Sequence, residues 1–421
     1  MKTANYINRI SDKLLQEQLN CTGAVLVEGA KWCGKTLSAL QFANSVIYMQ
    51  DPDEGQGYMA LADTKPSLLL EGEPPLLIDE WQMAPVIWDA VRFAVDRRNK
   101  MSQFILTGSV TPADNAMSHS GTGRISRLTM RPMSLFESSE SNGTVSLSML
   151  FEGEADIGFK STLTVEQIAN AICRGGWPAA IVAKTNSTRI ARNYLEAVIQ
   201  IDIKQADGVE KDPEKVRLLL QSLSRNISTM ASSKTILDDI QTNHSQLSDK
   251  TLNAYLNALR RIHVVEDIPA WQPSLRSKTA IRTANKRQFV DPSIAAAALR
   301  IDARGILKDF KTFGFLFESL CTRDLRVYAQ ALDGDIFHYR DKNELEADLI
   351  LKLNDGRWAA IEVKLGNSQI DVAAANLLKI TSKINTEKMK EPSFLMILTG
   401  GNVAYKRADG VLVVPIGCLK D

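Results

Sequence analysis

An eight-residue stretch beginning at Gly29 has the residue types and spacing of a loop that binds phosphate. It reads Gly-Ala-Lys-Trp-Cys-Gly-Lys-Thr, which matches the Gly-x-x-x-x-Gly-Lys-Thr pattern. Its glycines let the backbone curl so that N–H groups point at phosphate oxygens. Lys35 would place its ammonium on the β- and γ-phosphates, and Thr36 would offer its hydroxyl to Mg²⁺. The residues expected to contact the nucleotide in this loop are Gly29, Lys31, Trp32, Cys33, Gly34, Lys35, Thr36 and Leu37.

Two acids follow the next long apolar run of the chain. The run Leu76-Leu77-Ile78 ends in Asp79 and Glu80. Such a run is typical of a buried parallel strand whose carboxyl end faces a nucleotide. Asp79 would join Thr36 in holding Mg²⁺, and Glu80 would orient or deprotonate the attacking water.

Further polar residues come after a third apolar run, Gln103 to Leu106. Thr107 and Ser109 could contact the γ-phosphate or the water, although the end of any strand can carry such residues. Arg124 suits forked contacts with phosphate oxygens, within the chain or across a subunit interface. The alternative is a surface or structural arginine.

A second constellation, near the C-terminus, combines carboxylates with a lysine. Asp348 lies in one expected strand, and Glu362 and Lys364 lie two residues apart in the next, so they share a face. Asp348 and Glu362 could hold Mg²⁺ while the Lys364 ammonium positions water, and Glu318 on the preceding helix could complete the set. The same residues could instead form a structural charge network or bind a ligand without cleaving it.

The elements around the first constellation alternate between strands and helices. Strands are expected at Ala24 to Val27 and Ser45 to Met49, besides the two apolar runs above. A helix is expected over Leu37 to Ala43, where its dipole would favour phosphate. The first 21 residues carry leucine and isoleucine at helical spacing, which predicts an amphipathic helix. This order predicts a parallel α/β domain.

The elements around the second constellation run helix, three strands, helix, two strands. The two strands that carry Asp348 and Glu362 are joined by a turn at Asn354-Asp355-Gly356. The expected ranges are a helix over 313–330, strands over 335–340, 346–353 and 357–364, a helix over 373–384, and strands over 394–398 and 411–415.

The middle of the chain is mainly helical in pattern. A loop rich in Ser, Gly and Glu is expected over 138–153, then helices over 164–172 and 189–205 on either side of the break Gly175-Gly176-Trp177-Pro178. We expect this part to form a lid over the nucleotide. Three helical patterns between 213 and 267, the last capped by Ser248, precede a strand-rich piece, in the order of a winged helix-turn-helix.

A group of basic residues follows these helices. It contains Lys278, Arg282, Lys286 and Arg287, with Arg276 and Trp271 nearby. It could contact a DNA backbone, whereas a domain interface or a solvated face is the favoured alternative because the formal net charge of the chain is only +1.

Composition excludes several classes of protein. The 421 residues include 44% hydrophobic and 24% charged residues, as in ordinary globular proteins. The five cysteines and four histidines are dispersed, so neither a disulfide framework nor a zinc site is indicated. No apolar run approaches the roughly 20 residues of a membrane helix, and no apolar signal region opens the chain. We therefore expect a cytoplasmic protein with no membrane partner.

Several blocks together resemble one protein family. They are the loop at 29–36, Leu-Ile-Asp-Glu at 77–80, Phe-Ile-Leu-Thr-Gly-Ser at 104–109 and Gly-Arg at 123–124 with Arg-Pro-Met-Ser-Leu-Phe-Glu at 131–137. The chain resembles the AAA-like ATPases of bacteria and archaea that carry a C-terminal domain of unknown function with a nuclease-type core. The resemblance implies an ATPase module. The C-terminal set resembles the Asp…Glu-x-Lys signature of the restriction-endonuclease-like superfamily, with Glu318 as the helix acid.

The sequence therefore predicts an α/β protein of four parts. These are an AAA-like P-loop core over 1–150, a helical lid over 151–210, a winged-helix-like region over 211–305 and a nuclease-fold domain over 306–421. We expect binding and hydrolysis of ATP with Mg²⁺, coupled to action on DNA; an arginine working across an interface would require a homo-oligomer. The alternative is an ATP-driven switch whose nuclease fold binds DNA or protein without cutting. A small-molecule phosphotransferase is disfavoured because no acceptor pocket is evident.

Overall fold

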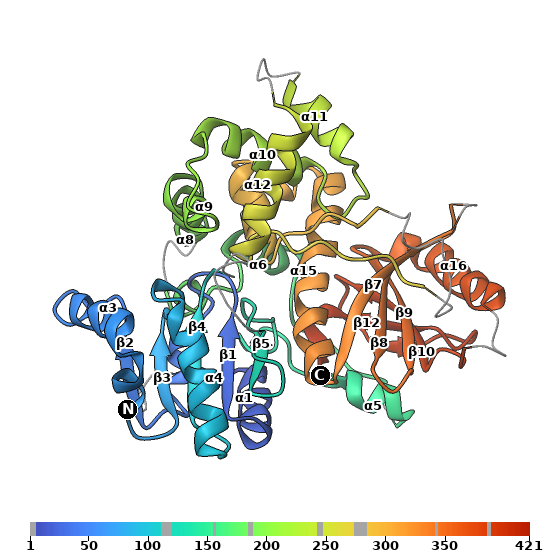
Figure 1. Cartoon of the computed structure of the whole chain (residues 1–421). Coiled ribbons are helices and arrows are strands. Elements are labelled where there is room, and N and C mark those ends of the chain that lie inside the picture. The colour runs from blue at the N-terminus through green and yellow to red at the C-terminus, as the bar shows by residue number, and fades with distance from the viewer. Residues whose placement is uncertain are drawn as a thin grey trace. The chain divides into compact units, whose positions relative to one another are not determined.

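The structure, a computed structural model, describes residues 6–110, 120–154, 157–183, 188–241, 247–272, 284–341, 344–384 and 389–421 (Figure 1). The chain divides into two units. Unit 1 comprises Met1–Pro132, Gln200–Lys211 and Tyr255–Val264. Unit 2 comprises Met133–Ile199, Asp212–Ala254 and Val265–Asp421.

Unit 1 is built on a five-stranded sheet, drawn in blue to green in Figure 1, in which every neighbouring pair of strands is parallel. The strand order is β2-β3-β4-β1-β5, so β4 separates the strand before the glycine loop from the strand that ends in Asp79. Because the strands are parallel, the ends of β1, β3 and β4 that carry the candidate residues lie at one edge. The strands are β1 Ala24–Glu28, β2 Ser45–Tyr48, β3 Leu76–Asp79, β4 Phe104–Gly108 and β5 Ile125–Thr129.

The helices of unit 1 partly follow the sequence pattern. The expected N-terminal helix is present and buries Leu15 and Leu19. The helix after the glycine loop spans only five residues, Lys35–Ala39, instead of continuing to Ala43. Since a helix dipole is the sum of aligned peptide units, its expected contribution to phosphate binding is correspondingly small. The first four helices are α1 Ile10–Cys21, α2 Lys35–Ala39, α3 Gly55–Thr64 and α4 Val86–Arg98.

The central part of the chain is helical, as its pattern predicts. The hydroxyl of Ser248 accepts the N–H of Thr251 at 3.1 Å, so the expected cap is formed. The expected loop over 138–153 is partly wrong, because Leu147, Leu150 and Phe151 lie at helical spacing and are buried in a short helix. The central elements are β6 Val145–Ser146, α5 Leu147–Glu152, α6 Val165–Arg174, α7 Pro178–Val182, α8 Thr188–Ala197, a π-helix Val198–Asp202, α9 Ile203–Gln205, α10 Pro213–Arg225, α11 Ser233–Gln241, α12 Asp249–Arg261, α13 Pro292–Ala298 and α14 Ala303–Ile306.

Unit 2 contains a six-stranded sheet of order β11-β12-β10-β9-β8-β7. The strands β7, β8 and β9 form an antiparallel meander, and β10 and β12 continue the sheet parallel to β9. The long helix α15 runs beside β7 in Figure 1, and α16 packs on β8, β9 and β10. The elements are α15 Phe310–Ala331, β7 Gly334–Arg340, β8 Glu346–Leu353, β9 Trp358–Lys364, α16 Ile370–Lys383, β10 Phe394–Thr399, β11 Tyr405–Lys406, β12 Leu412–Pro415 and β13 Leu419–Lys420.

The expected helix, three strands, helix and two strands are present in that order, with each boundary within about three residues of the prediction. The prediction missed two short strands, β11 between the last two expected strands and β13 after them. The core beneath α16 explains why the apolar pattern predicted these elements. Alternate strand residues such as Trp358, Ala360 and Ile397 pack against Ala373 and Leu377 of the helix.

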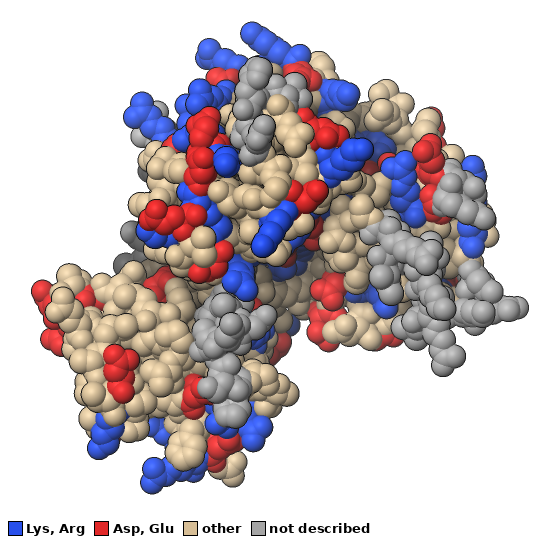
Figure 2. All heavy atoms as spheres, turned by 45° about the horizontal axis from the view of Figure 1, so that its top comes forward, with Lys and Arg blue, Asp and Glu red and all other residues tan. Residues whose placement is uncertain are grey.

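The distribution of charged side chains on the surface and the apolarity of the helices bear on possible partners. On the face shown in Figure 2, acidic and basic side chains of the described residues are interspersed. This distribution agrees with the formal net charge of +1. No helix in the described part of the chain combines the length and apolarity needed to cross a membrane.

Candidate functional site

The glycine loop adopts a backbone that only glycine tolerates at two positions. Gly29 has φ of 153°, and a Cβ there would lie 2.1 Å from the backbone oxygen of Met130. Gly34 has φ of 104° and immediately precedes α2. Both glycines are therefore required by the loop conformation itself, as the spacing predicts.

The Lys35 side chain is folded over the loop. Its ammonium donates to the carbonyls of Gly29 at 3.0 Å and Ala30 at 2.9 Å, and the residue is buried. Arg9, from the residues before α1, braces the loop by donating to the carbonyls of Cys33 at 2.8 Å and Arg131 at 2.7 Å. Sequence reasoning missed Arg9, because nothing in the local pattern connects it with a loop so far along the chain.

Asp79 is the centre of a hydroxyl network at the same edge of the sheet. Its Oδ1 accepts hydrogen bonds from Thr36 Oγ1 at 2.7 Å and Thr107 Oγ1 at 2.5 Å. Burial raises the pKa of Asp79 above its ordinary value, and the two hydroxyls oppose that shift. The structure therefore brings together three predicted residues from α2, β3 and β4.

Glu80 lies next to this network with its backbone in the left-handed region, φ 56°. Its Oε2 accepts hydrogen bonds from Ser109 Oγ at 3.1 Å and from the side-chain amide of Gln82. Ser109 is thus placed beside the candidate base, and Gln82 is a partner that sequence reasoning missed. These contacts fix the orientation of the Glu80 carboxylate.

The remaining loop residues differ in their surroundings. The Lys31 ammonium is paired with Asp202 Oδ1 at 2.6 Å and donates to Gln205 Oε1 at 3.0 Å. Trp32 and Leu37 are 50% and 43% exposed. Asp202 and Gln205 flank the junction between a π-helix and α9, and neither was predicted as part of the site.

Arg124 lies away from the glycine loop of the same chain. The prediction that it contacts the γ-phosphate within the chain is therefore wrong. Its backbone oxygen accepts the N–H of Ala24, the first residue of β1, whereas the loop follows the last residue of β1. Its guanidinium is paired with Asp96 at 2.8 Å. Because β1 and β5 are parallel, Arg124 lies at the opposite edge of the sheet, so it is excluded as a contact to a phosphate held by the same loop.

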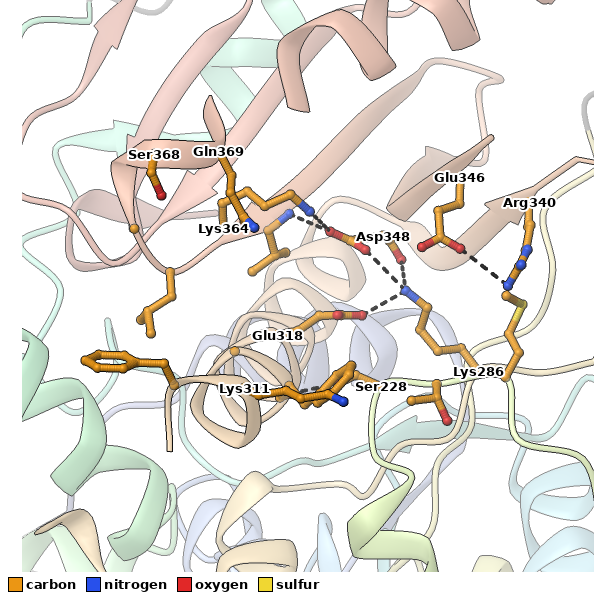
Figure 3. Close-up of a pocket in the computed structure, with 18 of the residues that line it drawn as sticks. Ser228, Lys286, Lys311, Glu318, Arg340, Glu346, Asp348, Lys364, Ser368 and Gln369 are labelled. Atoms are coloured by element: carbon orange, nitrogen blue, oxygen red, sulfur yellow. Dashed lines mark hydrogen bonds and ion pairs between the residues drawn. The ribbon is translucent and has the colours of Figure 1, made fainter. Parts of the chain in front are cut away.

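In unit 2, the four predicted residues of the C-terminal constellation lie together, and Figure 3 shows three of them, Glu318, Asp348 and Lys364. Asp348 lies opposite Glu362 in the β8–β9 pair, one residue beyond the Leu349–Ile361 pairing. The Lys364 ammonium contacts Asp348 Oδ2 at 3.1 Å and Glu362 Oε2 at 2.5 Å. Glu318 reaches the same cluster from α15. It contacts Lys286, which the sequence analysis places in the basic group that could contact DNA.

Lys286 belongs to this acidic cluster. Its ammonium lies 2.8 Å from Glu318 Oε1 and 3.6 Å from Asp348 Oδ1, and the residue is buried. Arg287 is also buried and paired with Asp267 at 3.0 Å, and Trp271 is 4% exposed. The hypothesis of an exposed DNA-binding patch is therefore wrong for these three residues, since all three are buried. Lys278, Arg282 and Arg276 lie outside the described residues.

The charges of the cluster shift the pKa values of its carboxyl groups in opposite directions. Burial alone would raise the pKa of Asp348, but Lys286 and Lys364 lower it to about 2. Burial, followed by the charge of Asp348, raises the pKa of Glu362 to about 8. Burial also raises the pKa of Glu318 to about 7, although Lys286 opposes this shift. The two lysines therefore favour ionisation of Asp348 over that of Glu318 and Glu362.

A cavity of about 830 Å³ opens beside the cluster, within the size range of small-molecule sites. Lys286, Glu318, Asp348 and Lys364 line it on one side. Elsewhere its lining includes Lys311, Arg340, Phe310, Phe315, Ser228 and Gln369. The cavity thus joins charged groups with aromatic and hydroxyl groups.

The two sites differ in their fit to a metal ion. Near the loop, Thr36 and Asp79 offer the hydroxyl and single carboxylate that suit Mg²⁺ shared with nucleotide phosphates. In unit 2, ammonium groups already contact the carboxylates of the cluster. Among the residues that the structure describes, no group of three His, Cys, Asp or Glu side chains could hold a metal ion.

His338 on β7 holds the segment that carries Lys286. Its Nε2 lies 3.0 Å from the carbonyl of Ala284, and the ring is buried. Burial, with the charge of Lys286, lowers the pKa of His338 from 6.5 to about 4. The folded state therefore keeps this ring neutral at pH values at which an unfolded chain protonates it.

Acidification from pH 6.5 to 4 is therefore expected to cost stability through His338. In this window the unfolded state binds the additional proton, so the contribution falls by up to about 1.4 kcal/mol per pH unit. His338→Gln keeps a donor toward Ala284 without this titration. The difference in free energy of unfolding between wild type and variant, measured in urea, should shift in favour of the variant as the pH falls. A difference that is constant with pH would contradict this expectation.

Comparison with known protein families finds matches in three parts of the chain. Residues 22–139 match the family model of an AAA domain. Residues 165–305 match a domain of unknown function, DUF8612, and residues 313–419 match another, DUF4143. The first match supports the P-loop ATPase predicted from the loop and from the acids after β3. The matched C-terminal families carry no statement of activity.

Two mycobacterial proteins and one archaeal structure are similar to the chain. The uncharacterized proteins Mb2031c of Mycobacterium bovis and Rv2008c of Mycobacterium tuberculosis are each 24% identical over 359 residues, covering 83% of this chain and 72% of theirs. The Walker-type ATPase PABY2304 of Pyrococcus abyssi shares 15% identity over 70% of this chain and 96% of its own, with a TM-score of 0.42.

Proposed function

We propose that the chain binds ATP with Mg²⁺ in the glycine loop of unit 1 and hydrolyses the γ-phosphate. The observation that carries this proposal is the convergence of Thr36 and Thr107 on Asp79, beside Glu80. In this proposal Thr36 and Asp79 supply oxygens to the metal ion and Glu80 is the base, beside the loop that carries Lys35. The match of residues 22–139 to an AAA domain supports the same activity.

Each residue has a distinct role in this proposal. The Lys35 ammonium exchanges its contacts with the loop carbonyls for phosphate oxygens, and the loop N–H groups contribute further donors. Thr36 and Asp79 hold Mg²⁺, which would neutralise charge that develops on the phosphates. Glu80, held by Ser109 and Gln82, orients the attacking water and accepts its proton.

Calorimetry with ATP in magnesium buffer tests the binding step, and release of inorganic phosphate tests hydrolysis. Wild type should bind ATP and release phosphate, and Lys35→Ala should lose most of both. Lys13→Ala is a matched control, because Lys13 lies on the exposed face of α1 with its side chain 84% exposed. Absence of ATP uptake by the wild-type chain would overturn the proposal.

A second candidate function concerns unit 2, where the element order and the cluster of Asp348, Glu362 and Lys364 support a restriction-endonuclease-like fold. In this proposal the cavity beside the cluster receives nucleic acid, and hydrolysis of ATP in unit 1 controls its binding. The domain could cut with Mg²⁺ or Mn²⁺, or bind without cutting. Incubation with DNA and RNA distinguishes these forms: cleavage that is lost in Asp348→Ala and Lys364→Ala supports a nuclease, and nucleic-acid binding without products supports binding alone.

A further inference from the structure

We propose that the Lys286 ammonium is the resident cation of the acidic cluster in unit 2 and takes the place of a divalent metal there. The proposal goes beyond ATP hydrolysis and favours the binding form of the second candidate function. It rests on the positions of Lys286, Glu318 and Asp348 within unit 2.

The Lys286 ammonium is surrounded by oxygens of the two acids that a metal would need. It donates to Glu318 Oε1 at 2.8 Å and to the backbone oxygen of Asp348 at 3.1 Å. Asp348 Oδ1 lies 3.6 Å away. An ammonium has three donors and no acceptor, so three oxygens are a suitable set of partners. Figure 3 shows Glu318 and Asp348 directed at this one nitrogen.

The second carboxylate oxygen of Asp348, Oδ2, also has partners. It accepts the N–H of Val363 at 2.9 Å and lies 3.1 Å from the Lys364 ammonium. A metal bound by Asp348 and Glu318 would therefore have to displace Lys286, because both Asp348 oxygens already face cationic or N–H groups. Two positive charges cannot share this buried position without strong repulsion.

The backbone holds Lys286 in place, so its position does not depend on its side chain alone. Lys286 and Ile268 exchange two backbone hydrogen bonds, of 2.8 and 2.9 Å. His338 secures the same segment through the carbonyl of Ala284. These contacts fix the backbone position from which the Lys286 side chain reaches the cluster.

Titration of the nucleotide-free full chain with MnCl₂, followed by the loss of the free Mn²⁺ signal in electron paramagnetic resonance, tests the proposal. Wild type and Asp348→Asn should take up the same amount of Mn²⁺, because no site depends on Asp348. Lys286→Met should gain one Mn²⁺ site that wild type lacks, and Lys286→Met combined with Asp348→Asn should lose it. Lys286→Arg, which keeps a cation, should resemble wild type.

Lys311→Met is the matched control, because Lys311 lines the same cavity and, within the described residues, forms no ion pair with Glu318, Asp348 or Glu362. It should show no gain of Mn²⁺ binding. An Asp348-dependent site in wild type, or an equal gain in Lys311→Met, would overturn the proposal. If circular dichroism shows that Lys286→Met does not fold, the comparison of wild type with Asp348→Asn decides alone. Because nucleotide is absent, the outcome is independent of whether unit 1 hydrolyses ATP.

Discussion

Glu80→Gln is expected to lower kcat for ATP hydrolysis by about 10²–10⁴-fold, the usual contribution of a positioned general base. The amide retains an oxygen that can accept from Ser109 and Gln82, so the local geometry should persist. What is lost is the negative charge and the ability to take a proton from water. Because Lys35, Thr36 and Asp79 remain, affinity for ATP should change little.

The measurement combines calorimetry for ATP affinity with phosphate release for turnover. Glu17→Gln is a suitable control, because it makes the same chemical change on the exposed face of α1, where Glu17 lies 3.9 Å from Lys13. It should leave both quantities unchanged. Equal turnover in wild type and Glu80→Gln would remove Glu80 from the proposed mechanism, and a parallel loss of affinity would assign it to nucleotide binding instead.

The candidate residues of unit 1 were predictable because they lie at the ends of apolar strands. The sequence marks Gly29, Gly34 and Asp79 by short-range spacing, and parallel strands bring such ends to one edge. Arg124 shows the limit of this reasoning. It precedes its strand instead of following it, and only the pairing of β1 with β5 reveals that this places it at the opposite edge.

The residues of the C-terminal site that lie on strands were predictable from the sequence, whereas Lys286 was missed. The apolar runs on either side of the Asn354-Asp355-Gly356 turn predicted β8 and β9, and the two-residue spacing predicted that Glu362 and Lys364 share a face. Lys286 comes from a segment with little regular structure, and its neighbours in the sequence are basic. Local composition therefore indicated a charged surface, whereas the tertiary fold buries Lys286 against acids far along the chain.

A second buried network of ion pairs and hydrogen bonds, centred on Arg323, links two sequence blocks for which the sequence predicts no structural role. Arg323 on α15 is fully buried and is paired with Asp291 at 3.1 Å and Asp324 at 2.7 Å. Asp291 also accepts the N–H of Gly176 at 2.9 Å, and Asp324 accepts the N–H of Leu135 at 2.9 Å. Leu135 of the Arg-Pro-Met-Ser-Leu-Phe-Glu block and Gly176 of the Gly-Gly-Trp-Pro break are therefore each bonded to one of the two aspartates that Arg323 joins.

Arg323→Met is accordingly expected to lower the free energy of unfolding of unit 2 by about 3–5 kcal/mol, the usual cost of breaking a buried ion pair from one side. Asp291 and Asp324 are 0% exposed, so neither can recover solvation when the guanidinium is lost. Arg225→Met is the matched control, because Arg225 pairs with Asp239 at 2.8 Å with both side chains partly exposed. It should cost about 1 kcal/mol or less.

Urea unfolding followed by tryptophan fluorescence measures both variants, with the buried Trp177 as a reporter in unit 2. Since a loss of about 3–5 kcal/mol is a large part of the stability of a typical domain, Arg323→Met should unfold at much lower urea than wild type. Equal midpoints for Arg323→Met and Arg225→Met would mean that water reaches the two aspartates. Because Asp291 caps α13 through the N–H of Ser293 at 2.9 Å, the loss should also extend to that helix, and amide exchange there should accelerate in Arg323→Met alone.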